Sequence, residues 1–388
     1  MNNLQIANTA VSDTLLPPMN SNRADISIIV PILNEAAELP GLLASLTAQE
    51  NVRFELILSD GGSSDGSQQV VAELSAECSF PARLIQTARG RGVQMNAGAA
   101  IATSKLLLFL HADSRFDDSA AISKSVDFCR FKGVSRSRLF AARFGVQFRR
   151  SEQSPSLAWF YYEAKARLPR GDCIRGDQGF LLDSRTLSHA GGFEESLPFL
   201  EDIRLVETLG AEVEWQLLPA AISTSARRFE REGVLQRQAL NAIIVNSVAT
   251  GWTEFFHALP GIYHCHTESG RLLLSPLLEG IAKLIGGHNR AWQRLFWQGT
   301  GHHVAGNAWQ LFFWLDVRRA FRDGKGAGEV DSYYLDFYRH RLERFFQGSL
   351  AAFLAQSAVK LWLRWMLLHF AFEMTPRQQG GSDAGVHD

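Results

Sequence analysis

Four short strand-like segments recur between residues 26 and 110, and a segment with helical periodicity follows each of the first three. They are ISIIVPI at 26–32, FELIL at 54–58, ARLIQ at 82–86 and LLLFL at 106–110. Most of them are too short for a buried helix and too continuously apolar for a half-exposed strand, so they predict strands covered on both faces. Repeated alternation of this kind predicts right-handed crossovers and a parallel sheet.

Polar side chains follow the predicted strands where each strand ends. They are Asn34 and Glu35, then Asp60 and Asp65, then Arg89 and Arg91, then His111 and Asp113. The carboxyl ends of parallel strands meet at one edge, where open α/β sheets bind their ligands. For any single group, a helix cap, a turn or a surface charge is the simpler explanation. Four groups on one edge favour a ligand site, with Asp113 as its chemical centre.

Two common phosphate-binding loops are absent after the first strand. PILNE at 31–35 contains neither G-x-G-x-x-G nor G-x-x-x-x-G-K-[ST], and it lacks the glycine-rich basic loop expected of a nucleotidyltransferase. The acidic loop at Asp60 suits recognition of a base or a ribose through carboxylate acceptors. The Arg89 and Arg91 pair suits a diphosphate.

The regular alternation ends beyond Asp118. Residues 138–148 have the alternating character of an antiparallel strand, and residues 180–182 form another apolar strand. Asp177 and Gln178 precede this second strand, where they either face an acceptor or simply form a turn. Glu201 and Asp202 begin a short helix, a position that the helix dipole favours for acidic residues in any case.

As a set, these motifs resemble the inverting glycosyltransferases of family 2, whose fold is called GT-A. The motifs are VPILNE (30–35), DGGSSDGS (60–67), His111-Ala112-Asp113 and Glu201-Asp202. More narrowly, ARGRGVQMNAGAA (88–100), FLHAD (109–113), GDQG (176–179) and TSARRFEREG (224–233) are similar to the radical-SAM/selenodomain-associated transferase 2 subgroup. The resemblance covers about residues 25–233. It implies an α/β fold of the GT-A type with a Rossmann-like mixed sheet. The residues beyond this region have no strand signal, and their segments rich in Leu, Phe and Trp, separated by glycines, predict an α-helical C-terminal domain.

The resemblance also implies a hexosyltransferase-type reaction, in which a nucleotide-diphosphate sugar donates its sugar to an acceptor hydroxyl with inversion. Asp202 would be the catalytic base with Glu201 beside it, since this transfer needs a carboxylate opposite the leaving diphosphate. Asp113 would hold Mn²⁺ or Mg²⁺, and an imidazole at His111, where the family usually has the first Asp of D-x-D, favours Mn²⁺. Asp177 and Gln178 would face the acceptor. The implied donor-binding residues are Pro31, Asn34, Glu35, Asp60, Gly61, Ser64, Asp65, Arg89, Arg91, Gln94, Asn96, His111 and Ala112.

Two other functions stay open at this point. Because His111 replaces a carboxylate, the chain could be a nucleotide-sugar-binding protein whose active site has decayed. A nucleotidyltransferase is the second alternative. Turnover of a sugar nucleotide separates an enzyme from a binding protein, and release of diphosphate from a nucleoside triphosphate would indicate the nucleotidyltransferase.

Composition limits the partners and the compartment. A net charge of -1 over 388 residues offers no field that would gather nucleic acid. Four cysteines without CxxC spacing favour a reducing, cytoplasmic location and argue against a zinc site. No window of 18 residues is apolar and free of charge, and no signal peptide is apparent. We expect disordered tails at 1–24 and 376–388, a catalytic domain at 25–226 and a helical domain at 227–375.

Residues 350–372 carry aromatic residues among basic ones, including Trp365 beside Lys360 and Arg364. This composition is typical of an interfacial helix, which would place the protein at the inner face of a membrane and present a lipid-linked acceptor to Asp202. A core helix with its two cations in water has equal weight, and it would favour a small soluble acceptor.

Overall fold

The computed structural model describes residues 24–76, 78–132, 139–152, 154–196, 199–266 and 270–371. For residues 370 and 371 it describes the backbone only. The predicted tails therefore lie outside the described residues, apart from Ala24. The chain divides into two compact units. The first comprises Met1–Ala226 and Gly326–Gly328, and the second comprises Arg227–Lys325 and Glu329–Asp388.

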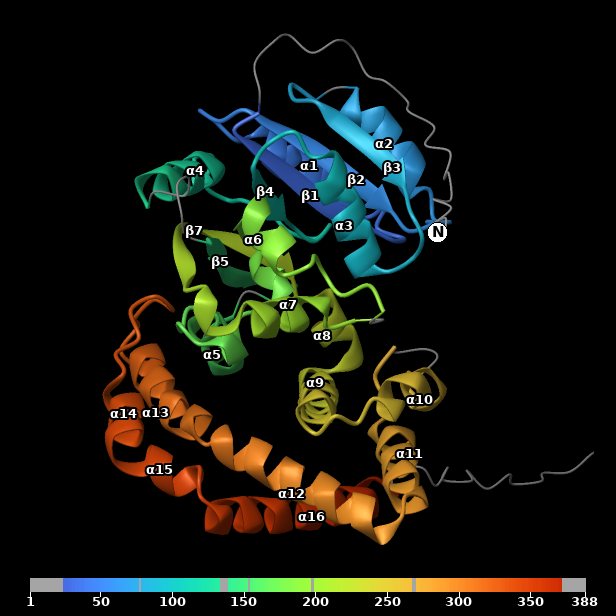
Figure 1. Ribbon diagram of the computed structural model, residues 1–388, viewed down its shortest axis with the longest axis vertical. Coiled ribbons are helices and arrows are strands. Elements are labelled where there is room, and N and C mark those ends of the chain that lie inside the picture. Colours follow the sequence, from blue (N-terminus) through green and yellow to red (C-terminus); the bar gives the residue numbers. More distant parts are fainter. Residues whose placement is uncertain are drawn as a thin grey trace, which may run out of the picture. The chain divides into compact units, whose positions relative to one another are not determined.

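The first unit contains a seven-stranded sheet in the order β3-β2-β1-β4-β6-β5-β7 (Figure 1). Its strands are β1 (Ile26–Ile32), β2 (Phe54–Asp60), β3 (Ala82–Gln86), β4 (Leu106–Phe109), β5 (Ala141–Arg149), β6 (Phe180–Asp183) and β7 (Trp215–Ser225). The first four strands are mutually parallel, as the alternating pattern predicts. β6 runs antiparallel to both β4 and β5. The mixed sheet confirms the predicted α/β architecture.

The strand β5 only partly matches its prediction as an antiparallel strand. It pairs antiparallel with β6 but parallel with β7. Every side chain from Ala141 to Val146 is buried, including that of Arg143, whose Nη2 donates to the Leu168 carbonyl at 2.6 Å. Both faces of this part of β5 are therefore buried, against different neighbours. An alternating sequence does not distinguish such a strand from one that buries a single face.

Helices cover both faces of the sheet. They are α1 (Leu39–Thr47), α2 (Ser67–Ser75), α3 (Arg91–Ile101), α4 (Ala121–Phe131), α5 (Leu157–Lys165), α6 (Ser184–His189) and α7 (Glu201–Leu209). Short 3-10 turns occupy Gly171–Cys173, Gly176–Gln178 and Gly210–Glu212. Along β1, Ile28 and Val30 join one apolar cluster, whereas Ile29 joins another on the opposite face. Covering on both faces explains why this strand is continuously apolar.

The second unit is helical, which confirms the predicted C-terminal helical region. Its helices are α8 (Arg227–Glu232), α9 (Val234–Ala249), α10 (Glu254–Ile262), α11 (Leu274–Gly287), α12 (Arg290–Gly306), α13 (Trp309–Arg322), α14 (Tyr333–Phe337), a π-helix (Tyr338–Leu342), α15 (Glu343–Phe346) and α16 (Ser349–Ala371). Trp309, Phe313 and Tyr338 are nearly fully buried in this unit. No described helix is both long enough and apolar enough to cross a membrane.

Candidate active site

The candidate site lies where several loops of the first unit meet at one edge of the sheet. The parallel strands β1 to β4 end at this edge, which the register of Ile32 with Asp60 and of Asp60 with Gln86 makes explicit. β6 runs in the opposite direction and pairs Phe180 with Phe109 of β4. The antiparallel strand therefore places the turn at Gly176–Gln178 beside the His111-Ala112-Asp113 strand end.

The loops after β1 and β2 are joined by hydrogen bonds between side chains and main chain. Asn34 lies in the left-handed region at φ 57°, and its Oδ1 accepts from the Ser64 N–H at 2.8 Å. The Asp65 carboxylate accepts from the Ala36 N–H at 3.0 Å, and the Glu35 N–H donates to the Ser67 hydroxyl at 2.9 Å. Hydrogen bonds from the Ser67 hydroxyl and from the main-chain N–H groups of Ala36 and Ser67 lower the pKa of Asp65. Asn34, Ser64 and Asp65 themselves are exposed at the rim, where a ligand can reach them.

Asp60 and Gln94 lie beneath these loops and are buried. The Asp60 carboxylate accepts from the Ser63 hydroxyl and from Gln68 Nε2, both at 2.6 Å. Gln94 Nε2 donates to the carbonyls of Ile32 and Ser59 at 2.8 and 2.7 Å, which ties the ends of β1 and β2 together. The donor contacts expected of Asp60 and Gln94 stay predictions, and in this structure both side chains are buried and shape the loops from within.

The remaining residues of the expected donor set differ in how deeply they are buried. Gly61 is buried against the Gln94 amide, to which an added Cβ would approach within 3.1 Å. Ala112 is buried as well, whereas Pro31 and Glu35 are half-buried and Arg89 is exposed. Only the last three can offer a side chain to a ligand without rearrangement.

Arg91 links the end of β4 to the start of α7. Its Nε lies 2.8 Å from Glu201 Oε1, and its Nη2 lies 3.1 Å from His111 Nε2. A guanidinium can only donate, so His111 Nε2 accepts this hydrogen bond and Nδ1 carries the ring proton. Burial raises the pKa of Glu201, and the charge of Arg91 opposes this effect. Arg91 is therefore already paired within the protein, unlike the exposed Arg89 with which it was grouped.

Three carboxylates of the predicted site act on one another. Burial raises the pKa of half-buried Asp177 to about 6, and the negative charges of Asp202 and Asp113 add to this effect. Asp202 is oriented by the Gly176 N–H, which donates to its Oδ2 at 2.7 Å. A Cβ at Gly176 would lie 3.3 Å from both Asp202 Oδ2 and His111 Nε2, so this position favours glycine. The predicted neighbours Asp113, Asp177, Glu201 and Asp202 thus gather at one place.

Gln178 does not share the position of Asp177. Its side chain is 2% exposed, and its Nε2 donates to the Cys173 carbonyl at 2.6 Å. These contacts are those of a residue that stabilises the turn, and the acceptor contact expected of Gln178 stays a prediction. Asp177 alone of this pair is accessible.

Asn96 supports the approach to α7 from a distance. Its amide exchanges two hydrogen bonds with the main chain of Phe193, at 2.8 and 2.9 Å, and donates a third to Glu195 at 2.8 Å. A Cβ at Gly192, whose φ is +86°, would come within 2.9 Å of Asn96 Oδ1. Asn96 therefore fixes a loop that leads toward Glu201 and Asp202.

Arg115, Arg149 and Glu38 hold the strand end in place, and the sequence interpretation missed all three. Arg149 Nη2 donates to the Asp113 carbonyl at 2.6 Å, and Arg115 Nη1 donates to the Ala112 carbonyl at 3.0 Å. Glu38 pairs with Arg115 at 2.9 Å. Arg115 lies two residues after Asp113 and Arg149 ends a strand, so extending the search for polar strand ends would have found both.

Within the described residues, no group of three or more His, Cys, Asp or Glu side chains is placed to hold a metal ion. Asp113 offers oxygen ligands of the kind that Mn²⁺ and Mg²⁺ accept, and a cation there would offset the repulsion among Asp113, Asp177 and Asp202. The donor set therefore fits a divalent ion that takes most of its ligands from a bound substrate or water.

Replacing Asp177 by Asn is expected to stabilise the metal-free protein above pH 6. The pKa of about 6 exceeds the ordinary 3.8, so the folded form keeps a proton that the unfolded form has lost, and stability falls as the pH rises between these values. The variant should gain about 1–3 kcal/mol in free energy of unfolding at pH 7 and little at pH 4. Urea denaturation in EDTA at both pH values measures this. A variant less stable than the wild type at pH 7 would contradict the electrostatic explanation.

Replacing Asn96 by Ala is expected to loosen the loop at 191–195. The main-chain N–H and C=O of Phe193 would lose their partners, which costs about 1–3 kcal/mol. Thermal unfolding should report lower stability, and limited proteolysis should cut this loop faster. Asn96→Asp keeps the acceptor for the Phe193 N–H but turns a carboxylate oxygen toward the Phe193 carbonyl and the Glu195 carboxylate, so it should lose at least as much stability at pH 7. An Asn96→Asp protein as stable as the wild type at pH 7 would show that the amide pattern is not what matters.

Comparison with known proteins identifies part of the first unit. The model of glycosyl transferase family 2 matches residues 27–174. A PGL/p-HBAD biosynthesis glycosyltransferase of Mycobacterium bovis is 38% identical over 104 residues, which are 26% of this chain and 40% of that protein. An uncharacterized glycosyltransferase of Haemophilus influenzae is 42% identical over 93 residues, or 24% of this chain and 30% of that protein.

Among solved structures, S. aureus TarS 1-349 in complex with UDP resembles this chain with a TM-score of 0.46 and 15% identity. That alignment covers 81% of this chain and 91% of the other. The chain matches 40% or less of the length of the two curated relatives. Together with the mixed sheet and the helical region after it, the family match confirms the GT-A prediction.

Proposed function

We propose that this chain, whose residues 27–174 form a glycosyl transferase family 2 domain, moves a sugar from a nucleotide-diphosphate sugar to an acceptor hydroxyl with inversion. The observation that carries the proposal is the meeting of Asp113, Asp177 and Asp202 at the carboxyl edge of the sheet. Such a cluster can both anchor a charged donor and accept a proton. The motifs at 88–100 and 224–233 support membership of the radical-SAM/selenodomain-associated transferase 2 subgroup.

Asp202 is the base in this proposal. The Gly176 N–H occupies its Oδ2, which leaves Oδ1 to accept the proton of the acceptor hydroxyl. As that oxygen bonds to the anomeric carbon, the bond from this carbon to the diphosphate breaks on the opposite face, and the nucleoside diphosphate leaves with the electron pair. Glu201 positions the site, because it is buried against Arg91 and faces no solvent.

Asp113 would hold Mn²⁺ or Mg²⁺, which neutralises charge on the leaving diphosphate when bound. His111 Nε2 accepts from Arg91, so it has no lone pair to offer a metal in this arrangement. The reason for preferring Mn²⁺ over Mg²⁺ is therefore withdrawn, and either ion suits Asp113. The exposed Asn34, Ser64, Asp65 and Arg89 are the side chains that we expect to contact the donor.

The acceptor would be a small molecule or a lipid-linked one, reached by a cytoplasmic protein in peripheral contact with the inner face of the membrane. The basic and aromatic residues of α16 support this part of the proposal.

A binding protein with a decayed site is the second candidate. It is favoured by one observation, since His111 stands where a carboxylate is usual and is held by Arg91. A nucleotidyltransferase is less well supported, because the glycine-rich basic loop that it needs is absent after β1.

Calorimetric titration with nucleoside diphosphates tests the donor site. Binding should strengthen when Mn²⁺ or Mg²⁺ is present, and Asp113→Asn should remove that strengthening. Replacing exposed Asp117, four residues further along the chain, should leave it intact. Binding that is indifferent to metal in the wild type would count against the proposed role of Asp113.

A further inference from the structure

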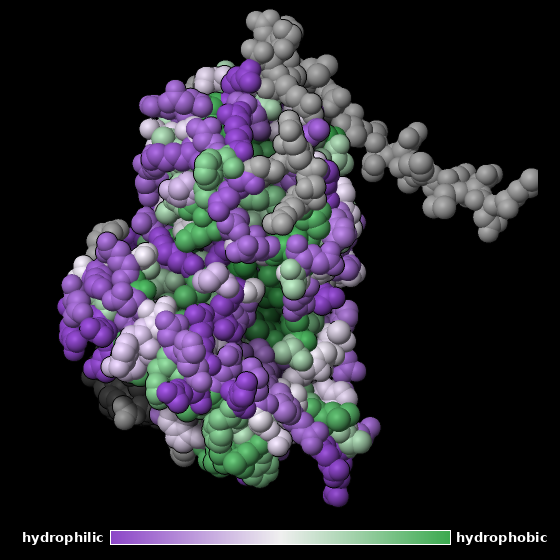
Figure 2. Space-filling view, turned by 60° about the vertical axis from the view of Figure 1, so that its left-hand side comes forward, coloured by the Kyte–Doolittle hydropathy of each residue, from purple (hydrophilic) through white to green (hydrophobic). Residues whose placement is uncertain are grey.

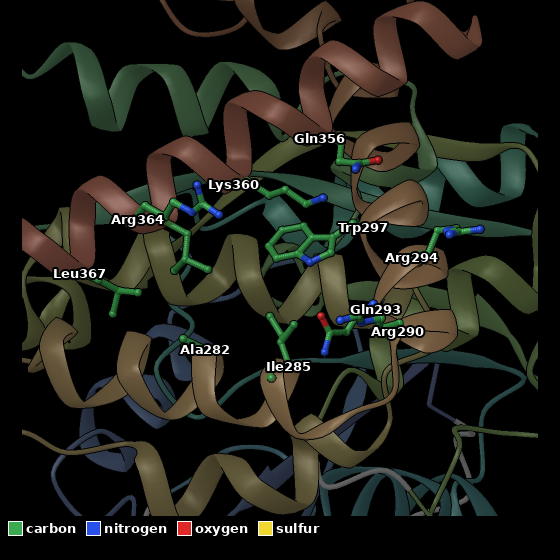
Figure 3. Close-up of a pocket in the computed structure, with 12 residues that line it drawn as sticks. Ala282, Ile285, Arg290, Gln293, Arg294, Trp297, Gln356, Lys360, Arg364 and Leu367 are labelled. Carbon is green, nitrogen blue, oxygen red and sulfur yellow. The ribbon is translucent and has the colours of Figure 1, made fainter.

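The second unit contains a cavity of about 640 Å³ between α11, α12 and α16 (Figure 3). Four cations line it, namely Arg290, Arg294, Lys360 and Arg364, and its lining includes no Asp or Glu. Within the described part of the chain, none of the four forms an ion pair. An excess of unpaired positive charge at one cavity favours an anionic ligand.

The cavity also has an apolar side. Figure 3 shows Trp297 in its middle, with Lys360 on one side and Ile285 on the other. Lys360 Nζ lies 5.1 Å from the centre of the Trp297 ring, and Leu363 and Leu367 of α16 complete the apolar lining. An inorganic anion would use only the cations, whereas a ligand with a charged group and an aliphatic part would use both kinds of wall.

The composition of the two long helices strengthens this point. α12 and α16 lie side by side in Figure 1, and neither contains an Asp or a Glu. The whole chain has a net charge of -1, so the basic character of this face is local. A local positive surface attracts anionic lipid headgroups within about 10 Å at ordinary salt.

α16 carries an exposed apolar stripe next to the cavity. Lys360, Leu363, Arg364 and Leu367 share the cavity face because they are three and four residues apart. On the adjoining face, large apolar side chains are 55–68% exposed: Leu350, Leu354, Leu361, Trp365 and Leu368. In the space-filling view of Figure 2, green apolar and purple polar side chains lie next to one another on the face that is shown. Leu361, Trp365 and Leu368, which a core helix would bury, are therefore exposed, whereas Ala351, Ala352 and Met366 of α16 are buried.

We propose that the cavity binds the phosphate headgroup of an anionic phospholipid while the exposed stripe of α16 enters the outer acyl layer. This inference deepens the membrane contact proposed above and does not depend on sugar transfer. The cations supply charge complementarity, and the stripe supplies apolar area that water would otherwise cover. α16 lies in the membrane surface, because Lys360 and Arg364 and its modest hydropathy do not suit a spanning helix.

Sedimentation with vesicles tests the proposal on the full chain. We expect binding to vesicles of phosphatidylglycerol and phosphatidylcholine, no binding to phosphatidylcholine alone, and weakening as salt rises. Lys360→Gln with Arg364→Gln should weaken partition about 25-fold, since each surface cation contributes about fivefold. The matched control is Arg319→Gln with Arg322→Gln on α13, which removes the same charge from exposed positions and should change partition much less.

A second variant tests the apolar stripe. Leu361→Asn with Leu368→Asn alters only exposed side chains, so the protein should fold normally and lose vesicle binding. Two results would overturn the proposal. One is pyrophosphate binding that depends on Lys360 and Arg364 without any vesicle binding, which would indicate a site for a soluble anion. The other is self-association without lipid that Leu361→Asn abolishes, which would assign the stripe to a second copy of the chain.

Discussion

Asp202→Asn should lose about 10²- to 10⁴-fold in the rate of sugar transfer while nucleoside diphosphate binds almost as in the wild type. The substitution removes the proton acceptor but keeps a side-chain oxygen that can still accept the Gly176 N–H. Local geometry is thereby preserved, and the loss falls on the chemical step. Single-turnover rates measured beside calorimetric binding separate the two effects.

The control for this variant is Glu207→Gln on the same helix. Glu207 is exposed and pairs only with Arg204 in the described structure, so transfer should continue at nearly the wild-type rate. If Asp202→Asn instead weakens donor binding as much as it slows transfer, the residue belongs to the donor site or to the fold, and the role of base is wrong.

Asp113→Ala should abolish turnover, and excess EDTA should do the same to the wild type. The charge that develops on the leaving diphosphate needs a cation, and Arg91 is already committed to Glu201 and His111. Added Mn²⁺ or Mg²⁺ should restore the EDTA-treated wild type but not the variant. Initial rates of nucleoside diphosphate release measure both.

Asp117→Ala serves as the matched control, because it removes an exposed carboxylate from the same loop. Circular dichroism should show that Asp113→Ala is folded, since Arg149 holds the main-chain carbonyl of Asp113 and not its side chain. Full activity in EDTA would rule out the metal, and an inactive but unfolded variant would leave EDTA treatment of the wild type as the deciding experiment.

The first half of the sheet could be predicted because burial on both faces leaves a clear trace in the sequence. Ile28 and Ile29 face opposite apolar clusters, and that requirement is what makes the segment continuously apolar. The edge of the sheet at which the polar side chains gather could be predicted from strand direction alone, without knowledge of any side-chain contact. The same reasoning fell short at β5, where parallel and antiparallel neighbours coexist on one strand.

The sequence predicted which residues of the candidate site lie near one another better than it predicted their individual contacts. Asp113, Asp177 and Asp202 come together although 89 positions of chain separate the first from the last. The antiparallel pairing of β6 with β4 brings Asp177 beside Asp113, and the Gly176 N–H holds Asp202 there. The depth of a side chain was not predictable, since a carboxylate such as Asp60 has the same sequence signature whether it faces a ligand or accepts hydrogen bonds from neighbours such as Ser63 and Gln68. Arg115 and Arg149 were missed because the search stopped at the polar residues nearest the ends of the first four strands, although both lie at or just after a strand end and hold carbonyls there.

Release of nucleoside diphosphate from a panel of nucleotide sugars, with Mn²⁺ or Mg²⁺ present, tests the central claim most directly. The account predicts that at least one sugar nucleotide is turned over, that EDTA stops the release, and that Asp113→Ala shows none. Tight, metal-dependent binding of sugar nucleotides without turnover of any would contradict enzymatic transfer and favour the binding protein. Release of diphosphate from a nucleoside triphosphate, with sugar nucleotides left intact, would contradict it in favour of a nucleotidyltransferase.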